Sequence, residues 1–200
     1  PTTDAEMRST YLSGKKAILK NLPTPTVKSI SNHSYATIRS CINDYLIAGK
    51  LPPKINVEFN KNSNIYEIEE SEMAITIANN IRIRSKTNDE DYLIILGILW
   101  SDDFDPNSSL KANRGSAWIK TLTFVTDGDN KNDVTNTYVL SIGHKNENHD
   151  VIEREIVTEL NELSRDVANS FYSTALKKNV GVYFRVIVAL GDQPERRHIN

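Results

Sequence analysis

The sequence contains a single cysteine, and this scarcity excludes two kinds of small stabilised protein. Cys41 has no second cysteine with which to form an internal disulfide. A thiolate zinc site, which needs several cysteines, is excluded for the same reason. Cys41 lies among apolar residues at helical spacing, without an identifiable partner base, so we expect a buried free thiol. One unpaired cysteine fits a reducing, intracellular compartment.

Long apolar runs and a strong net charge are also missing. No apolar run approaches the ~20 residues that span a bilayer, and the first residues are polar, so neither a membrane partner nor a secretory signal is expected. The net charge of −2 gives no overall attraction to nucleic acid. Residues 1–54, however, hold eight Lys or Arg against three acids and carry about +5. Such a segment can contact DNA phosphates, although an ordinary solvated face is the stronger interpretation on composition alone.

The first 90 residues are predicted to be mainly helical. Residues 1–54 form a basic helical segment with a break at 22–26, where two prolines remove backbone donors. Ser34 is expected to cap a second helix in this segment. Residues 55–90 are predicted to be a linker with one further helix between Ile68 and Ile83. The apolar stripe of the second helix comprises Ile38, Cys41, Ile42, Tyr45 and Leu46.

The rest of the chain, residues 91–200, is predicted to have the element order β-β-β-α-β. Three strands joined by turns should be antiparallel, and a helix should then return the chain so that the fourth strand lies parallel to the first. Trp100 and Trp118 are expected to be core residues, as apolar strand tryptophans usually are. The fold class is therefore α/β with a mixed sheet. The predicted strands cover 92–100, 117–125, 136–142 and 180–190, and the helix covers 150–176.

Aspartates follow the two strands that are predicted to be parallel neighbours. Asp102 and Asp103 follow the first strand, and Asp192 follows the last. Neighbouring strands lie about 4.8 Å apart, so carboxylates at their carboxyl ends should converge. Two close carboxylates favour a cation between them, and Mg²⁺ prefers oxygen ligands together with substrate phosphates. A single aspartate after a strand is more often a turn residue, so the joint placement carries the prediction.

Three short segments resemble the catalytic motifs of CACTA (En/Spm-like) DNA transposases. They are Ser101-Asp-Asp-Phe-Asp-Pro-Asn, Ser116-Ala-Trp-Ile-Lys-Thr-Leu-Thr-Phe and Gly191-Asp-Gln-Pro-Glu-Arg-Arg. In that family a Ser-Asp-Gly-x-Asn/Asp-Pro stretch, a Ser-x-Trp strand and an Asp-x-Pro motif follow one another. The resemblance covers roughly residues 92–200. Asp102 matches the first acid of the family and Asp192 the second, while Asp103 stands where the family usually has glycine.

This resemblance implies a ribonuclease-H-like fold and metal-dependent DNA strand cleavage and transfer by the full-length protein. It implies Asp102 and Asp192 as catalytic residues and metal ligands, and Mg²⁺ or Mn²⁺ as the cofactor. Of the adjacent pair Asp102 and Asp103, either is a candidate metal ligand, and Asp102 is favoured. The third acid of the family, normally Glu on a later helix, is not found before Asn200. The domain is therefore expected to be C-terminally truncated and this chain to be inactive alone. Transposon-end DNA is the implied partner, a homo-oligomer is allowed, and the implied location is nuclear.

Basic residues near the predicted carboxylate ends are candidate contacts for DNA phosphates. Solubilising loop charges are an equally good interpretation of them. Histidines in the segment before the long helix suggest metal ligands, but a polar loop that caps the long helix, with Asn148 or Asp150 near the cap, is favoured. Arg185, inside the fourth strand, should face outward or pair with an acid. The basic candidates are Lys111, Arg114, Arg196 and Arg197, and the histidines are His144 and His149.

A second function is compatible with the same residues. A domesticated relative would keep the fold and act only as a DNA-binding or protein-interaction module, and Asp103 in place of glycine fits that alternative. An unrelated α/β protein with chance matches is a third interpretation. Whether the chain belongs to an enzyme stays open on the sequence alone. A Gly-rich phosphate loop, a Ser-His-Asp signature and a nucleotide fingerprint are all missing.

Overall fold

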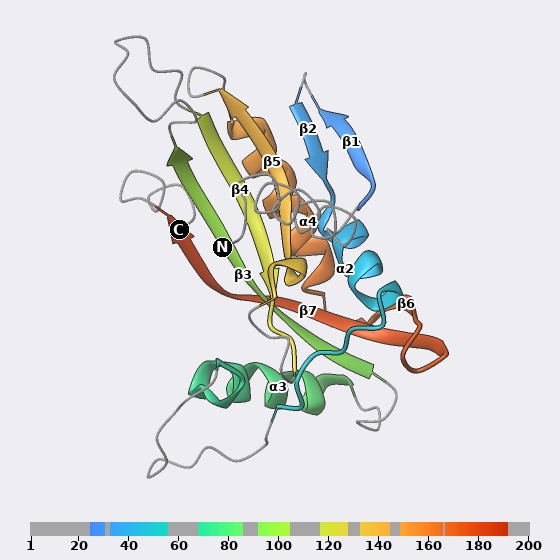
Figure 1. Cartoon of the computed structure of the whole chain (residues 1–200). Helices are drawn as coiled ribbons and strands as arrows, with labels where there is room; N and C mark the ends of the chain where they lie inside the picture. Colours follow the sequence, from blue (N-terminus) through green and yellow to red (C-terminus); the bar gives the residue numbers. More distant parts are fainter. Residues whose placement is uncertain are drawn as a thin grey trace, which may run out of the picture.

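A computed structural model gives the architecture of most of the chain. It describes residues 25–30, 33–55, 68–85, 92–104, 117–127, 133–144, 149–165 and 167–191. Within these ranges the chain is a mixed α/β protein with a five-stranded, mixed and curled sheet and three α-helices (Figure 1). A separate two-stranded hairpin lies near one edge of this sheet.

The central sheet has the strand order β5-β4-β3-β7-β6. Strand β3 pairs antiparallel with β4, and β4 pairs antiparallel with β5, as predicted for strands joined by turns. Strand β3 also pairs with β7, and this pairing is parallel, which confirms the predicted neighbours. The strands are β3 (Tyr92–Phe104), β4 (Ala117–Phe124), β5 (Thr137–His144), β6 (Asn169–Ser173) and β7 (Lys178–Gly191).

The helix before β7 is shorter than predicted, and an additional strand follows it. Helix α4 (Asp150–Leu163) ends thirteen residues before the predicted end at Leu176. Strand β6 then pairs antiparallel with β7 and forms one edge of the sheet. Phe171 is buried between the exposed Ser170 and Tyr172, a period of two that favours a strand over a helix. The predicted order β-β-β-α-β therefore gains one strand between its helix and its last strand.

A β-hairpin occupies part of the segment that was predicted to be helical. Strands β1 (Val27–Ile30) and β2 (His33–Ala36) pair antiparallel. Ser34 lies in β2 and points away from the core, so its predicted role as a helix cap is wrong. Residues 1–24, predicted to contain the first helix, and the polar segment 56–67 lie outside the described residues.

Helix α2 (Ile38–Ile47) begins three residues later than predicted. Its cap is Thr37, whose side chain accepts the backbone N–H of Ser40 at 3.1 Å. The predicted apolar stripe is confirmed, since all five of its residues are buried. Cys41 is a buried free thiol, as expected, and burial raises its pKa above the ordinary value of 9.0.

Two apolar layers cover opposite faces of the sheet. Helices α2 and α4 and strand β2 share one buried cluster with β3, β4, β5 and β7, in which Trp118 is a large fully buried residue. Helix α3 (Glu72–Ser85), preceded by a 3-10 turn (Ile68–Glu70), covers the other face and confirms the helix predicted there. Figure 1 shows α3 across one end of β3 and β7 only. That layer includes Ala74, Ile75, Ala78 and Ile81 against Tyr92, Ile94, Leu96, Tyr183 and Ile187.

The prediction that Trp100 is a core residue is wrong, because α3 covers only part of this face of the sheet. Its exposed fraction is 52%, whereas Trp118 is 1% exposed and fulfils its predicted core role. Trp100 lies on the face that α3 covers, but beyond the stretch that α3 contacts. None of the helices in the described part of the chain is long and apolar enough to span a membrane.

Gly97 allows the middle of β3 to approach its neighbours closely. A Cβ atom at this position would lie 2.9 Å from Cδ1 of Leu122 and 2.9 Å from ring atoms of Phe184. The register between β3 and β7 also shifts between Gly97 and Ile98, on the path to the carboxyl end of the strand. A side chain larger than hydrogen would therefore displace the core beneath the candidate site.

Candidate functional site

The carboxyl ends of the inner strands β3 and β7 lie side by side at the same end of the sheet. The two strands run in the same direction, and their last paired residues are Ser101 and Gly191. Parallel neighbours lie about 4.8 Å apart, so the backbones at Ser101 and Gly191 are adjacent, and the residues that follow them in the sequence begin side by side. The strand arrangement on which the aspartate prediction depended is therefore present.

Asp102 lies within β3 and not in a loop after it. The prediction of a polar loop that begins at Ser101 is wrong for residues 101–104. Strand β3 continues to Phe104, and Asp102 pairs with Ile119 of β4. The side chain of Asp102 is half-buried. Side chains alternate along a strand, so Asp102 shares a face with Trp100, while Ser101 faces α4. A partly exposed carboxylate at a sheet edge is a suitable oxygen ligand for Mg²⁺ or Mn²⁺.

The other predicted site residues are less completely described. The backbone of Asp103 pairs with Trp118, and nothing is described of its side chain. Asp192 follows Gly191 directly in the sequence and lies outside the described residues, as do the four basic candidates for DNA contact, Lys111, Arg114, Arg196 and Arg197. Among the described residues, no group of three or more His, Cys, Asp or Glu side chains is placed to hold a metal ion.

A buried lysine lies behind Asp102, on the opposite face of the sheet. The ammonium of Lys120 donates to Oγ of Ser101 at 2.8 Å and to Oε1 of Glu153 at 2.9 Å. The side chain of Lys120 is 4% exposed and that of Glu153 is 19% exposed. Nδ1 of His149 lies 3.0 Å from the same oxygen, Oε1 of Glu153. This network joins β3, β4 and the first turn of α4 at the level of Asp102.

Sequence reasoning missed this network, although one signal for Lys120 was present. Lys120 falls in the inward phase of β4, between the buried Trp118 and Leu122. A charged residue at an inward strand position needs a partner, because burial of an unpaired charge is costly. Its partner Glu153 is 33 residues away on a helix, and no local pattern points to it.

The two candidate histidines lie on different elements, since His144 ends β5 and His149 precedes α4. His149 occupies the N-cap position of α4 without a side-chain capping bond, and Asp150 begins the helix. The favoured interpretation of a polar helix start agrees with this position, although residues 145–148 lie outside the described residues. The ring of Trp118 lies 5.6 Å from the ring of His149 and 5.6 Å from that of His33. The indole of Trp118 therefore packs near the rings of both His33 and His149.

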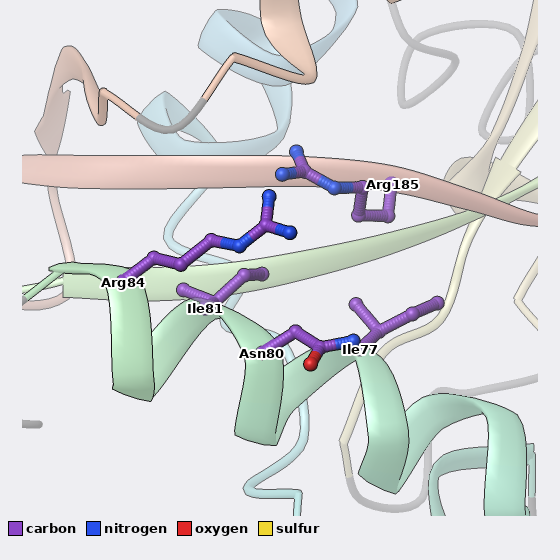
Figure 2. Close-up of a pocket in the computed structure, with 5 residues that line it drawn as sticks. All are labelled: Ile77, Asn80, Ile81, Arg84 and Arg185. Atoms are coloured by element: carbon purple, nitrogen blue, oxygen red, sulfur yellow. The ribbon is translucent and has the colours of Figure 1, made fainter.

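A small polar pocket lies between α3 and β7, away from the carboxyl ends of the strands. It has a volume of about 140 Å³ and is lined by two arginines, an asparagine and two isoleucines (Figure 2). Arg185, predicted to face outward or to pair with an acid, is half-buried there, and its Nη1 donates to the carbonyl of Phe184 at 2.8 Å. The lining residues are Ile77, Asn80, Ile81, Arg84 and Arg185.

No protein-family model matches the chain, and no curated protein matches it.

Proposed function

We propose that this chain is part of the catalytic domain of a CACTA (En/Spm-like) DNA transposase with a ribonuclease-H-like sheet. Asp102 and Asp192 are its metal-binding carboxylates. The full-length protein would cleave transposon-end DNA and transfer the strand. The proposal depends on one observation above the others: β3 and β7 are parallel neighbours whose last paired residues are Ser101 and Gly191.

That pairing matters because it joins motifs that are far apart in the sequence. Asp102 and Asp192 are each one residue beyond a member of the Ser101–Gly191 pair, although 90 residues separate them along the chain. Adjacent carboxylates at a sheet edge repel each other unless a cation lies between them. The order of the central strands, β5-β4-β3-β7, further supports a ribonuclease-H-like arrangement, from which the chain departs in having β6 between α4 and β7.

The roles of the residues follow from their chemistry. A bound Mg²⁺ or Mn²⁺ would polarise a DNA phosphate and lower the cost of the charge that develops on it. Asp102 and Asp192 would hold that cation from two strands, so that its position is fixed by the sheet. The Lys120–Glu153 pair ties β4 to α4 behind Asp102 and would keep this end of β3 in place. Lys111, Arg114, Arg196 and Arg197 would contact DNA phosphates, and thereby orient the substrate.

Calorimetric titration of the 200-residue chain with Mn²⁺ tests the proposal. Asp102→Asn and Asp192→Asn should each weaken binding at least about tenfold, because each removes a charged ligand worth at least about 1.4 kcal/mol. Asp127→Asn is the matched control. Asp127 is exposed and follows β4, which runs opposite to β3, so it lies at the other edge of the sheet.

The same titration separates the enzyme from the non-catalytic module. Equal Mn²⁺ affinity for the wild-type chain and Asp102→Asn would overturn the metal site. If such a chain still bound DNA, with an affinity that falls as salt rises, the interpretation as a DNA-binding module would replace the present proposal.

A further inference from the structure

Trp100 is an exposed tryptophan inside a paired strand. It lies in register with Thr121 of β4 on one side and Leu190 of β7 on the other. Its backbone is therefore fixed, while half of its surface remains accessible at 52% exposure. Leu190 beside it is 37% exposed. A large aromatic side chain that is held exposed on a rigid element, beside a second exposed apolar residue, is a candidate binding surface.

The position of Trp100 relative to Asp102 gives this surface a specific meaning. The two residues are two positions apart on β3, so their side chains leave the same face about 6.7 Å apart along the strand. One is a flat apolar ring system, and the other is the carboxylate assigned above to a metal-bound phosphate. A nucleotide presents the same two groups, a flat base and a phosphate, linked by a sugar.

We propose that Trp100 is a stacking platform for an unpaired base of the DNA strand whose phosphate is held at Asp102. The inference rests on the proposed function, and it adds that the substrate is single-stranded or locally unpaired at this point. Bases of a duplex are already covered by their neighbours, so only an unpaired base can offer its face to an indole. Stacking of this kind tolerates any base, because every base has a π-face.

A protein partner suits this face less well than a base does. A helix or a second copy that covered Trp100 and Leu190 would also cover the adjacent Asp102 and would remove its carboxylate from water. Such desolvation is costly unless an opposite charge accompanies it. A nucleotide places its base on the indole and leaves the carboxylate beside a cation and a phosphate, so both residues keep a suitable environment. The hydroxyl of the half-buried Thr121 adds a polar group beside Trp100.

Two tryptophans with very different exposure make the test direct. The 200-residue chain is titrated with a twelve-nucleotide oligothymidine in Mg²⁺ buffer, and again in metal-free buffer containing a chelator, in which no cleavage occurs. Fluorescence of Trp100 is isolated with Trp118→Phe or, if that core variant does not fold, as the difference between wild type and Trp100→Phe. We expect quenching by the single strand and weaker quenching by the same sequence in a fully paired duplex.

Affinity measurements supply the second readout. Trp100→Ala should weaken binding of the oligothymidine about tenfold, and Trp100→Phe should restore most of the loss, because a phenyl ring also stacks. Val139→Ala is the matched control. Val139 is 50% exposed and lies in the same row of the sheet, opposite Thr121 on β5, but away from Asp102. Its substitution should change the affinity less than twofold.

The outcomes distinguish this inference from the proposed function. Asp102→Asn should abolish the gain in affinity that Mg²⁺ gives, but it should not abolish quenching of Trp100 by the oligonucleotide. If the fluorescence of Trp100 does not respond to the oligonucleotide and Trp100→Ala binds like the wild type, the stacking proposal is overturned while the metal site stands. Protection of Trp100 from acrylamide that increases with protein concentration would overturn it too, because a second copy would then cover this face.

Discussion

The ammonium of Lys120 lies 2.9 Å from Oε1 of Glu153, across the interface between β4 and the first turn of α4. Both side chains are largely removed from solvent, and Ser101 accepts a second hydrogen bond from the same ammonium. A buried ion pair is a weak source of stability as a pair, but the loss of one partner leaves the other charge uncompensated.

Glu153→Gln should therefore lower the free energy of unfolding by about 3 kcal/mol. Chemical denaturation followed by circular dichroism measures this change. Glu162→Gln, on the exposed side of the same helix, should change the stability by less than about 0.5 kcal/mol. The double variant Lys120→Met with Glu153→Leu should lose less than Glu153→Gln does, since it leaves no buried charge. Wild-type stability of Glu153→Gln would show that the ammonium is solvated.

Glu159 of α4 stabilises the start of α2 from outside that helix. Its carboxylate accepts the hydroxyl of Tyr35 at 2.6 Å and the backbone N–H groups of Ile38 at 2.8 Å and Arg39 at 3.2 Å. These are N–H groups that a helix cannot satisfy within itself. Glu159→Ala should cost about 2 kcal/mol of unfolding free energy and speed hydrogen exchange at both amides.

The control for Glu159 lies one turn earlier on the same helix. Glu155 forms an ion pair with Lys28 in which the side chains are 33% and 43% exposed. Exposed pairs contribute between zero and about 1 kcal/mol, so Glu155→Ala should have a small effect and leave exchange at Ile38 unchanged. Equal effects of the two substitutions would contradict the capping role.

Three buried tyrosines predict instability in alkaline solution. Burial raises the pKa of Tyr45 from 10.0 to about 12. Burial, and then the hydrogen bond to Glu159, raises the pKa of Tyr35, while burial and the charge of Asp44 raise that of Tyr138. Above pH 10 the unfolded chain releases these protons and the folded chain retains them. The stabilisation is therefore complete below pH 10 and is lost as the pH rises through the folded-state values.

Denaturation at several pH values between 9 and 11.5 measures this effect. Each retained proton should lower the free energy of unfolding by up to about 1.4 kcal/mol per pH unit above pH 10. Tyr45→Phe should reduce the slope by that amount. Tyr172→Phe, which changes a tyrosine that is 49% exposed, should leave the slope as it is in the wild type. A stability that does not change up to pH 11.5 would contradict the burial of these hydroxyls.

Gly97→Ala should destabilise the sheet beneath the candidate site. The added methyl group would lie 2.9 Å from Leu122 Cδ1 and from the ring of Phe184, a residue that is 0% exposed and has little room to move. Overpacking of this kind costs about 1–3 kcal/mol. Thermal and chemical denaturation of the variant provide the measurement. A change below about 0.5 kcal/mol would mean that the core relaxes freely around β3.

The sequence predicts the central strands better than their ends. The apolar run from Tyr92 predicts β3, and three strands followed by a helix predict the parallel return of β7. The run ends at Trp100, yet pairing with β4 extends the strand to Phe104. This extension is a tertiary effect that overrides the local preference of polar residues for a loop. The exposure of Trp100 is also a tertiary effect, because it depends on how much of the sheet face helix α3 covers.

The network behind the site shows a second limit. Lys120 falls at an inward position that the alternation of β4 identifies, but Glu153 becomes its partner only when α4 packs on the sheet. The hairpin of β1 and β2 was missed for a related reason. Its strands have four residues each, too short to show a period of two clearly, and its second strand contains a serine that resembles a helix cap.

Paramagnetic broadening by Mn²⁺ tests the shared site at the ends of β3 and β7 most directly. In an amide spectrum of the 200-residue chain, substoichiometric Mn²⁺ should broaden the signals of Ser101, Asp102 and Gly191 together, and Asp102→Asn should abolish all three effects. Broadening confined to one strand end, or none at either end while Mn²⁺ broadens signals elsewhere in the chain, would contradict the account.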